Sequence, residues 1–531
     1  MTALTCRRQR IKIETKETPC RGFTHTGGNK MKRNQLNLLA LDLGSSNGRG
    51  ILGRFDGEKI TLEEIHRFEN SYIEMGGMVY WDILHIFSNI KRAFQKFSLM
   101  NTGGLACFGI DAWGNDYGLI DKNGRLLSDA RSARHTTAED MERVHQIVPG
   151  LELFYQTGNS SYTINTLYQL YRRVCEGDPG IENANAMLMI PDLLAFFCTG
   201  EMHSEYTIST TTAMYNPTLK DWNRETIRRL GIPERILQPI AAPGTLCGEL
   251  LPSVAAAASL KRVPCALVGS HDTASAAAAV PVSDNKENYA FCSSGTWSLF
   301  GIETDTPIFQ DEMYENGFSN EGTVQGGFRP LKNITGLWLL QECRKEWRRN
   351  GKDLSYGEIT AAAQRSAPLR SLIDPGHSDF FGVTSMPAQI AQYCKRTGQP
   401  VPRTEGETAR CICESLALKY RWTIERLEAI TGRPIERLYI VGGGTQNKLL
   451  NQMTADCTGK PVTAGPVEGA CVGNLLTQAM ALGEISNIGE LREVVRNSFI
   501  LEEYEPKQSA MWNDAFERME AISGSRDLPE K

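Results

Sequence analysis

The stretch "LLALDLGSSNGRGILGRFDGEKITL", residues 38–62, decides the fold. An apolar run ends in Asp42, a turn of small residues follows, and a second apolar run is closed by Asp56-Gly57. An apolar run bounded by turn residues is typical of a buried strand, and Asp-Gly is a strong hairpin signal. The stretch therefore predicts a strand, a tight turn, a second strand and a hairpin into a third.

Three glycines of this stretch, Gly48, Gly50 and Gly53, match the G-x-G-x-x-G pattern of dinucleotide-binding loops. Such a loop must open a helix, because the helix N-terminus supplies the N–H groups that meet the pyrophosphate. Here a hairpin is predicted instead of a helix. We therefore interpret the match as accidental and keep a dinucleotide oxidoreductase only as a remote alternative.

The turn after Asp42 offers another way to hold phosphate. Backbone N–H groups of a Gly/Ser turn, with the hydroxyls of Ser45 and Ser46, can cradle a polyphosphate, and Asp42 can hold a hydrated Mg²⁺ beside it. The alternative is an ordinary hairpin with a capping aspartate. A similar element, "SSGTWS" at 293–298, predicts a second phosphate hairpin with the hydroxyl of Thr296, or else a buried hairpin with Trp297 in the core.

The composition of the 531-residue chain narrows the function classes. A net charge of −5 and a pI near 6.0 disfavour nucleic acid and anionic membranes as partners. No apolar run approaches the roughly 18 residues of a membrane span, and the basic first 30 residues lack the apolar centre of a secretion signal. We expect a cytoplasmic protein with no nucleic-acid or membrane partner, whose 14 cysteines, in no C-x-x-C pair, are reduced thiols.

The order of strand-like and helical segments predicts two α/β lobes. Residues 36–282 alternate strands such as "LACFGIDAWG" with helices such as "TLYQLYRRVCEG", and the polar stretch "SDNKEN", 283–288, is the expected boundary. In the second lobe, residues 288–505, the segment "RLYIVGGGTQNKLLNQMTADCTGKPV" predicts a βαβ unit whose helix stops at Gly459. We expect residues 1–35 to be a disordered basic extension, with Met31 as a candidate start, and residues 506–531 to be a helical tail.

Three further segments carry candidate site residues. In "VGSHDTASAA", 268–277, Asp272 stands at a strand-to-helix turn, where it can act as a general base or cap the helix. The glycines of "VGGGTQN", 441–447, let a bulky ligand such as adenine approach, or else form a sharp turn; we favour the ligand. "DAWGNDYG", 111–118, suits a sugar through Trp113 and Tyr117, but equally a core.

Walker, zincin and nucleophile-elbow motifs are absent from the sequence, so the corresponding ATPases, metalloproteases and α/β-hydrolases lose support. Seven segments follow one another along the chain: "DLGSSNGR", "GIDAWGNDYG", "MIPDLLAFFCTG", "GSHDTASA", "SSGTWSL", "LKNITGLWLLQE" and "IVGGGTQNKLLNQMTAD". This ordered series resembles the FGGY carbohydrate kinases, and within them those that act on L-rhamnulose. The resemblance runs from about residue 36 to about 505. It implies an α/β, two-lobed, actin-like (ribonuclease H-like) fold with ATP and sugar in a central cleft between the lobes.

The resemblance also implies an activity and its residues. The activity is ATP- and Mg²⁺-dependent phosphorylation of L-rhamnulose at its C1 hydroxyl, giving L-rhamnulose 1-phosphate and ADP in L-rhamnose breakdown. By position, Asp272 matches the catalytic base. Sugar-contacting positions are Gly114, His271, Thr273 and Asn333. Nucleotide-contacting positions are Ser45, Ser46, Asn47, Gly48, Arg49, Thr296, Gln341 and Gly443. The metal stays assigned to Asp42 on the chemistry of the turn given above.

Asn47 departs from the family pattern, because close relatives often carry serine there. The alternatives are a kinase for another ketose, such as L-fuculose or L-xylulose, and an actin- or Hsp70-like ATPase. We expect a monomer that binds only the sugar and ATP, with a dimer as the alternative.

Overall fold

The computed structural model describes residues 35–100, 102–128, 130–283, 287–507 and 510–523. The chain from Gln35 onward forms one compact unit. The predicted N-terminal extension lies outside the described residues up to position 34, as do residues 284–286 of the expected boundary and 508–509 and 524–531 of the expected tail.

A six-stranded sheet organises the first part of the chain, in the order β13-β14-β6-β1-β2-β3. Strand β2 runs antiparallel to both β1 and β3, whereas β6 runs parallel to both β1 and β14. The strands are β1 Leu36–Leu43, β2 Asn47–Phe55, β3 Ile60–Glu69, β6 Leu105–Ala112, β13 Thr245–Glu249 and β14 Pro264–Leu267. The predicted hairpins of residues 38–62 are confirmed, and no helix follows Gly50, so the dinucleotide interpretation is excluded.

Strand β1 is buried on both faces because its apolar residues occupy both sets of alternating positions. Leu39, Leu41 and Leu43 pack in one core with helices α1, Ile83–Leu99, and α6, Ile190–Thr199. Leu38 and Ala40 face the opposite core, which contains helices α17, Gly469–Ala481, and α18, Ile488–Ser498. Side chains alternate along a strand, so Asp42 belongs to the α17 side. A register slip of one residue would exchange the two faces.

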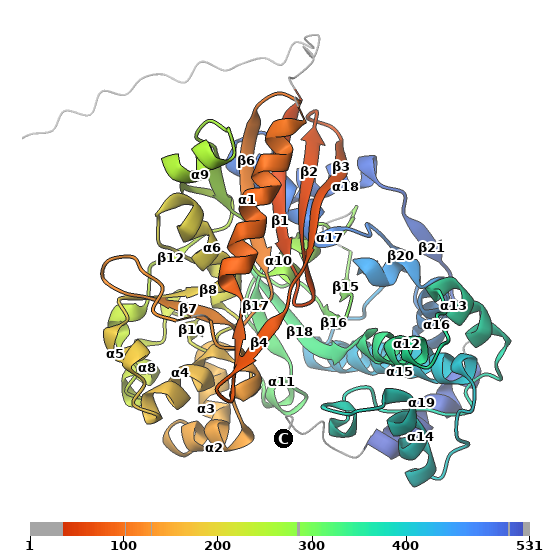
Figure 1. Ribbon diagram of the computed structural model, residues 1–531. Coiled ribbons are helices and arrows are strands. Elements are labelled where there is room, and N and C mark those ends of the chain that lie inside the picture. The colour runs from red at the N-terminus through yellow and green to blue at the C-terminus, as the bar shows by residue number, and fades with distance from the viewer. Residues whose placement is uncertain (1–34, 101, 129, 284–286, 508–509, 524–531) are drawn as a thin grey trace, which may run out of the picture. The chain divides into compact units, whose positions relative to one another are not determined.

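A seven-stranded sheet, β17-β18-β16-β15-β19-β20-β21, repeats this plan in the second part (Figure 1). Strand β15 forms a hairpin with β16 and runs parallel to β19, as β1 does with β2 and β6. The strands are β15 Tyr289–Ser294, β16 Trp297–Gly301, β17 Ser319–Gly322, β18 Phe328–Thr335, β19 Arg437–Val441, β20 Val462–Ala464 and β21 Glu502–Tyr504. The predicted α/β, two-lobed, actin-like (ribonuclease H-like) fold is confirmed.

The remaining strands form short pairs, and helices fill the connections. The pairs are β4 Tyr72–Met75 with β5 Met78–Trp81, β7 Tyr117–Ile120 with β8 Ala186–Met189, β9 Ser204–Glu205 with β12 Ile240–Ala241, and β10 Tyr215–Asn216 with β11 Asp221–Trp222. Further helices before residue 283 are α2 Ala138–Ile147, α3 Gly150–Thr157, α4 Thr166–Cys175, α5 Pro179–Asn183, α7 Tyr206–Ser209, α8 Arg224–Arg229, α9 Pro252–Ala257 and α10 Asp272–Ala278. After residue 287 they are α11 Asp311–Glu315, α12 Trp338–Arg349, α13 Tyr356–Arg365, α14 Met386–Arg396, α15 Glu405–Thr431, α16 Lys448–Thr458 and α19 Ala510–Ser523.

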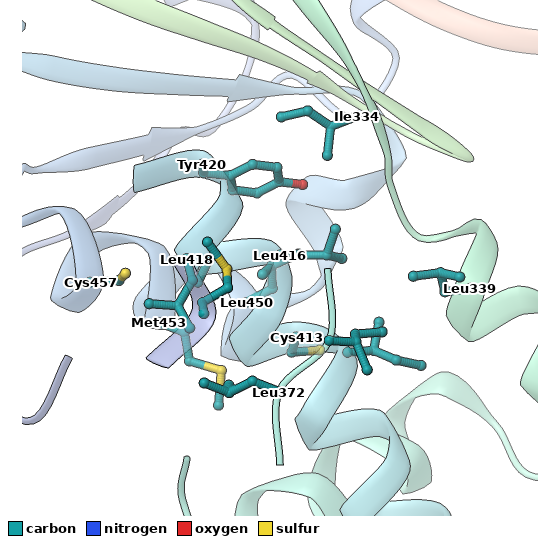
Figure 2. Packing of buried hydrophobic residues seen from close by; sticks show 14 of the residues in the cluster. Ile334, Leu339, Leu372, Cys413, Leu416, Leu418, Tyr420, Leu450, Met453 and Cys457 are labelled. Atoms are coloured by element: carbon teal, nitrogen blue, oxygen red, sulfur yellow. The ribbon is translucent and has the colours of Figure 1, made fainter. Parts of the chain in front are cut away.

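The predicted βαβ unit of the second lobe is β19, α16 and β20, and its helix stops at Gly459 with a φ of 66°. Figure 2 shows the core beside it, where Leu416 and Tyr420 of α15 lie near Leu450 and Met453 of α16. The cysteines of the described chain are unpaired thiols, and all but Cys175 are buried. Among the described helices, none combines the length and the apolar character that crossing a bilayer requires.

Helices α10 and α17 cross between the two sheets. Residue 473 is a glycine because an added Cβ would lie 1.8 Å from the carbonyl oxygen of Ser275 on α10. Helix α10 also packs its small side chains Ala276 and Ala277 against Phe291 of β15. The helix that begins with Asp272 is therefore in contact with both sheets.

Candidate active site

A cleft of about 1250 Å³ is lined by residues of both lobes. Most of the predicted site residues line it: Asp42, Ser45, Asn47, Arg49, Gly114, His271, Asp272, Thr273, Thr296, Asn333, Gln341 and Gly443. The structure therefore gathers segments that are up to about 400 residues apart in the sequence around one space. The elements that carry them are the ends of β1, β6 and β14, the two hairpin turns, strand β18, helix α12 and the turn after β19.

Two predicted residues, Ser46 and Gly48, do not line the cleft. Ser46 is exposed at the tip of the turn, and its carbonyl accepts a hydrogen bond from Asn70 N at 3.1 Å. Gly48 is buried under Phe68, where a Cβ would lie 2.2 Å from Cζ of the ring. The glycine at this position is explained by packing within the sheet.

Asp272 stands at the first position of α10, beside the carboxyl ends of β14 and β6. Its Oδ1 accepts hydrogen bonds from Thr273 N at 2.6 Å and from Thr273 Oγ1 at 3.2 Å. Its Oδ2 takes part in neither contact, and 32% of the side chain is exposed in the cleft. Burial raises the pKa of Asp272, the charge of Asp42 adds to this, and the imidazole of His271 opposes it. One oxygen thus holds the start of the helix while the carboxylate still faces the cleft.

A second group of acids surrounds Arg49 beside the turn of the first hairpin. The guanidinium of Arg49 pairs with both Asp42 and Glu468, and Cys471 Sγ donates to Asp42 Oδ2 at 3.2 Å. Asp111 on β6 is in register with Asp42 on β1. Burial and the charge of Asp42 raise the pKa of Asp111 well above its ordinary value.

The three glycines after β19 have different roles. A Cβ on Gly442, whose φ is 90°, would lie 2.9 Å from Ser294 O, and a Cβ on Gly444 would lie 2.0 Å from Ser294 Oγ. By contrast, no atom lies within 4 Å of a Cβ on Gly443, which lines the cleft. Two of the glycines let the turn pack against β15, and the third leaves space for a ligand.

We predict that Gly443→Ala raises the KM for ATP about tenfold, because the new methyl group enters the ligand space at a cost of about 1–3 kcal/mol. Gly444→Ala is the matched control, since neither glycine has a positive φ. It should instead lower the melting temperature through its clash with Ser294. Steady-state kinetics and thermal melts separate the two effects, and a G443A variant with an unchanged KM for ATP would contradict the assignment.

The segment "DAWGNDYG" divides between site and core. Trp113 and Asp116 line the cleft, and Trp113 Nε1 donates to Asp116 Oδ2 at 2.9 Å. Trp81 Nε1 donates to the same oxygen at 2.7 Å, and burial raises the pKa of Asp116 to about 6. Tyr117 is buried in the core of the first lobe. The sugar interpretation is thus compatible with Trp113 and not with Tyr117.

The second hairpin carries Thr296 in its turn, and Thr296 Oγ1 donates to Gln341 Oε1 at 3.4 Å. The alternative that Trp297 is a core residue is wrong. Trp297 is 41% exposed, lines the cleft and stacks on Phe381 with ring centroids 6.3 Å apart. Sequence reasoning also missed Glu321 and Lys332, which line the cleft from β17 and β18. Glu321 lies in no recognisable motif, whereas Lys332 lies in "LKNITGLWLLQE", next to Asn333.

A fully buried carboxylate supports the loop that precedes Asp272. Glu205 accepts hydrogen bonds from Thr207 N at 2.9 Å, Ile208 N at 3.0 Å and Ser270 N at 3.3 Å. Burial raises the pKa of Glu205 from 4.5 to about 7. The folded protein therefore retains a proton on Glu205 over a pH range in which the unfolded chain has released it.

We predict that the free energy of unfolding falls as the pH rises from about 4.5 to 7, because the stability linked to this proton is fully present below the unfolded pKa. The contribution of Glu205 is on the order of 3 kcal/mol. A glutamine at position 205 cannot titrate, so the free energy of unfolding of Glu205→Gln should depend less on pH. Urea denaturation at a series of pH values measures this dependence for both proteins. Parallel curves for the two proteins would show that Glu205 does not titrate in this range.

Comparison with known proteins gives a family and close relatives. Residues 37–279 match the N-terminal domain of the FGGY family of carbohydrate kinases, and residues 290–482 match its C-terminal domain. A rhamnulokinase from Bacteroides thetaiotaomicron is 40% identical over 482 residues, which cover 90% of this chain and 98% of that protein. A rhamnulokinase from Bacillus subtilis is 36% identical over 470 residues, 88% of this chain and 95% of that protein.

Solved structures share the fold at much lower identity. A xylulose kinase from Lactobacillus acidophilus superposes with a TM-score of 0.77 at 14% identity, covering 92% of this chain and 99% of that one. A glycerol kinase from Plasmodium falciparum, solved with ADP, superposes with a TM-score of 0.72 at 14% identity, covering 92% of this chain and 98% of that one. Together with the two domain matches and the relatives above, these results show that the chain belongs to the FGGY family of carbohydrate kinases, which implies the use of ATP.

Proposed function

We propose that this protein transfers the γ-phosphoryl group of MgATP to the C1 hydroxyl of L-rhamnulose, giving L-rhamnulose 1-phosphate and ADP. Relatives named rhamnulokinase, 36–40% identical over about 90% of the chain, support the substrate. The observation that carries the proposal is Asp272, a carboxylate that faces a cleft walled by two Gly/Ser hairpin turns.

Asp272 acts as the general base. Its carboxylate accepts the proton of the C1 hydroxyl while the hydroxyl oxygen bonds to the γ-phosphorus and the bond from phosphorus to the β-phosphate oxygen breaks. A raised pKa makes a carboxylate a stronger base, and this suits an alcohol as the proton donor. The base must be ionised, so kcat/KM should fall as the pH drops through this raised pKa.

The hairpin turns hold the phosphates in this proposal. Ser45 and Asn47 in the first turn and Thr296 in the second offer hydroxyl and amide donors in addition to backbone N–H groups. Gly443 leaves room for the adenine or ribose. Because phosphoryl transfer depends mainly on positioning and charge stabilisation, donors on both sides of the phosphates meet its main requirement.

The chemistry of Asp42 and Asp111 fits a magnesium ion. The described residues contain no group of three or more His, Cys, Asp or Glu side chains that could hold a metal. Mg²⁺ usually binds one or two carboxylates together with waters and phosphate oxygens, so it does not require such a group. Asp111 Oδ1 is buried without a hydrogen-bond partner among the described residues. Asp42, with Asp111 behind it, would hold the ion, which neutralises phosphate charge.

The sugar side of the cleft has matching groups. Asn333 lines the cleft, and its buried Oδ1 has no hydrogen-bond partner in the described part of the chain, so a sugar hydroxyl can donate to it. His271 offers a ring nitrogen beside Asp272. The indole of Trp113 provides an apolar face for the methyl group of a 6-deoxyketose.

A panel of ketoses tested with MgATP examines this proposal. We expect ADP release to depend on L-rhamnulose, with kcat/KM higher for it than for L-fuculose or L-xylulose. A higher value for either of these sugars would reject the substrate, and ADP release that no sugar stimulates would reject the kinase proposal. We expect a monomer as the active form, with a dimer as the alternative, and size-exclusion chromatography with light scattering distinguishes the two.

A further inference from the structure

A buried ion cluster from the second lobe contacts the imidazole beside the proposed base. Glu321 Oε2, on β17, lies 3.0 Å from His271 Nδ1 and 3.2 Å from Arg329 Nη2 on β18. Arg329 Nε donates to Gly322 O at 2.8 Å. The side chains of His271, Glu321 and Arg329 are 8%, 7% and 0% exposed, so water scarcely competes for these contacts.

The contact with Glu321 defines the tautomer of His271. Arg329 Nη2 also lies 3.4 Å from His271 Nδ1, but the contact of Nδ1 with Glu321 Oε2 is shorter, at 3.0 Å. A carboxylate can only accept, so the proton in the shorter contact belongs to Nδ1. In the neutral imidazole Nε2 is then the acceptor. Nε2 lies 3.6 Å from Asp272 Oδ1, and His271 lines the cleft. The lone pair of Nε2 is thus presented close to the proposed base.

The main chain on both sides of this contact is fixed by one segment. Thr207 Oγ1 on α7 accepts a hydrogen bond from His271 N at 3.3 Å. Thr210 Oγ1, just after α7, accepts one from Gly322 N at 2.7 Å. The segment from 207 to 210 therefore ties the loop that carries His271 to the strand that carries Glu321. The position of the imidazole depends on both lobes.

Stability alone does not account for this cluster. Replacing a buried ion pair by apolar side chains is often neutral or stabilising. Arg329 Nη1 is moreover buried with no hydrogen-bond partner among the described residues, which costs free energy. Burial raises the pKa of Glu321, but its contacts with His271 and Arg329 more than offset the effect of burial, so the pKa lies below its ordinary value and the carboxylate stays ionised. A cluster that carries such costs beside the reacting groups points to a role in binding.

We propose that Glu321 is a positioning residue for the kinase reaction: it fixes the proton of His271 on Nδ1, so that Nε2 accepts a hydrogen bond from a ketose hydroxyl next to Asp272. This inference rests on the proposed function. Glu321 thus determines the affinity for the sugar without contacting the phosphates.

The kinetic test is Glu321→Gln, which keeps the size of the side chain and removes its charge. We expect the KM for the ketose to rise about tenfold, while the KM for ATP changes less than twofold. Glu303→Gln is the matched control. Glu303 forms a similarly buried pair with Arg492, 2.7 Å apart, and does not line the cleft. That variant should lower the melting temperature and leave the KM for the ketose unchanged; the same behaviour in E321Q would overturn the proposal.

A measurement without substrate separates this inference from the proposed function. Nitrogen-15 NMR of the imidazole at alkaline pH, with the signal assigned through His271→Asn, should show a protonated Nδ1 in the wild-type protein and a loss of this preference in E321Q. A protonated Nε2 in the wild type would overturn the inference, whichever sugar the enzyme accepts. If E321Q does not fold, Glu321→Asp keeps the charge with a shorter reach. It should raise the KM for the ketose, and an unchanged KM would again overturn the proposal.

Discussion

Asp272→Asn is expected to lower kcat by about 10²–10⁴-fold, the range that a general base contributes. Asparagine keeps the shape of the side chain, and its Oδ1 can still accept the hydrogen bonds from Thr273 that hold the start of α10. It cannot take up the proton of the ketose hydroxyl. The melting temperature and the KM for ATP should therefore stay close to the wild-type values while turnover collapses.

Glu490→Gln provides the control for Asp272→Asn. Glu490 lies in the first turn of α18, accepts a hydrogen bond from Ser486 N at 2.8 Å and does not line the cleft. Loss of this carboxylate should leave kcat within about twofold of the wild-type value, because most surface substitutions have small effects. Near-normal turnover in the Asp272 variant would remove Asp272 from the role of base, and an equal loss in both variants would indicate a general effect of changing helix-start carboxylates.

Asp42→Asn is expected to raise the Mg²⁺ concentration needed for half-maximal activity by about 10–100-fold and to lower kcat by about 10²-fold. The substitution removes the carboxylate that faces α17 and leaves Arg49 paired with Glu468. Chelation of Mg²⁺ should abolish activity in both proteins, and added Mg²⁺ should restore it. Activity measured as a function of free Mg²⁺ gives both quantities.

Glu468→Gln distinguishes the loss of a metal ligand from the loss of an ion pair with Arg49. Glu468 is the other carboxylate on Arg49. If Asp42 acts only by holding Arg49, the two variants should shift the Mg²⁺ dependence equally. We expect the half-saturating Mg²⁺ concentration of the Glu468 variant to change less than twofold, and a normal Mg²⁺ dependence in Asp42→Asn would contradict the metal assignment.

Local patterns in the sequence were sufficient for the elements that carry the site. The apolar run before Asp42, the Asp56-Gly57 turn and the glycine stop at Gly459 each report a conformation decided within a few residues. The resemblance to the carbohydrate kinases then indicated which turns share one cleft. Twelve of the fourteen predicted site residues line that cleft.

The residues that sequence reasoning misjudged depend on contacts between distant segments. Gly48 fits the phosphate-loop pattern, but its need for a hydrogen in place of a side chain comes from Phe68, 20 residues away. For Trp297 the sequence left a core position open as the alternative to a phosphate hairpin, and only the contact with Phe381 shows that it is exposed. Glu321 becomes visible only when β17 meets the loop of His271.

The packing of α17 and α18 on the first sheet bears on how the chain folds during synthesis. One face of β1 is covered by Leu475, Val472 and their neighbours, which leave the ribosome more than 400 residues after β1 does. Until then Leu38, Ala40 and Ile51 lack their final partners, although the other face has already met α1 and α6. The first lobe should therefore not reach its stable state ahead of the second, and a nascent chain arrested near residue 283 should expose an apolar sheet face that chaperones bind.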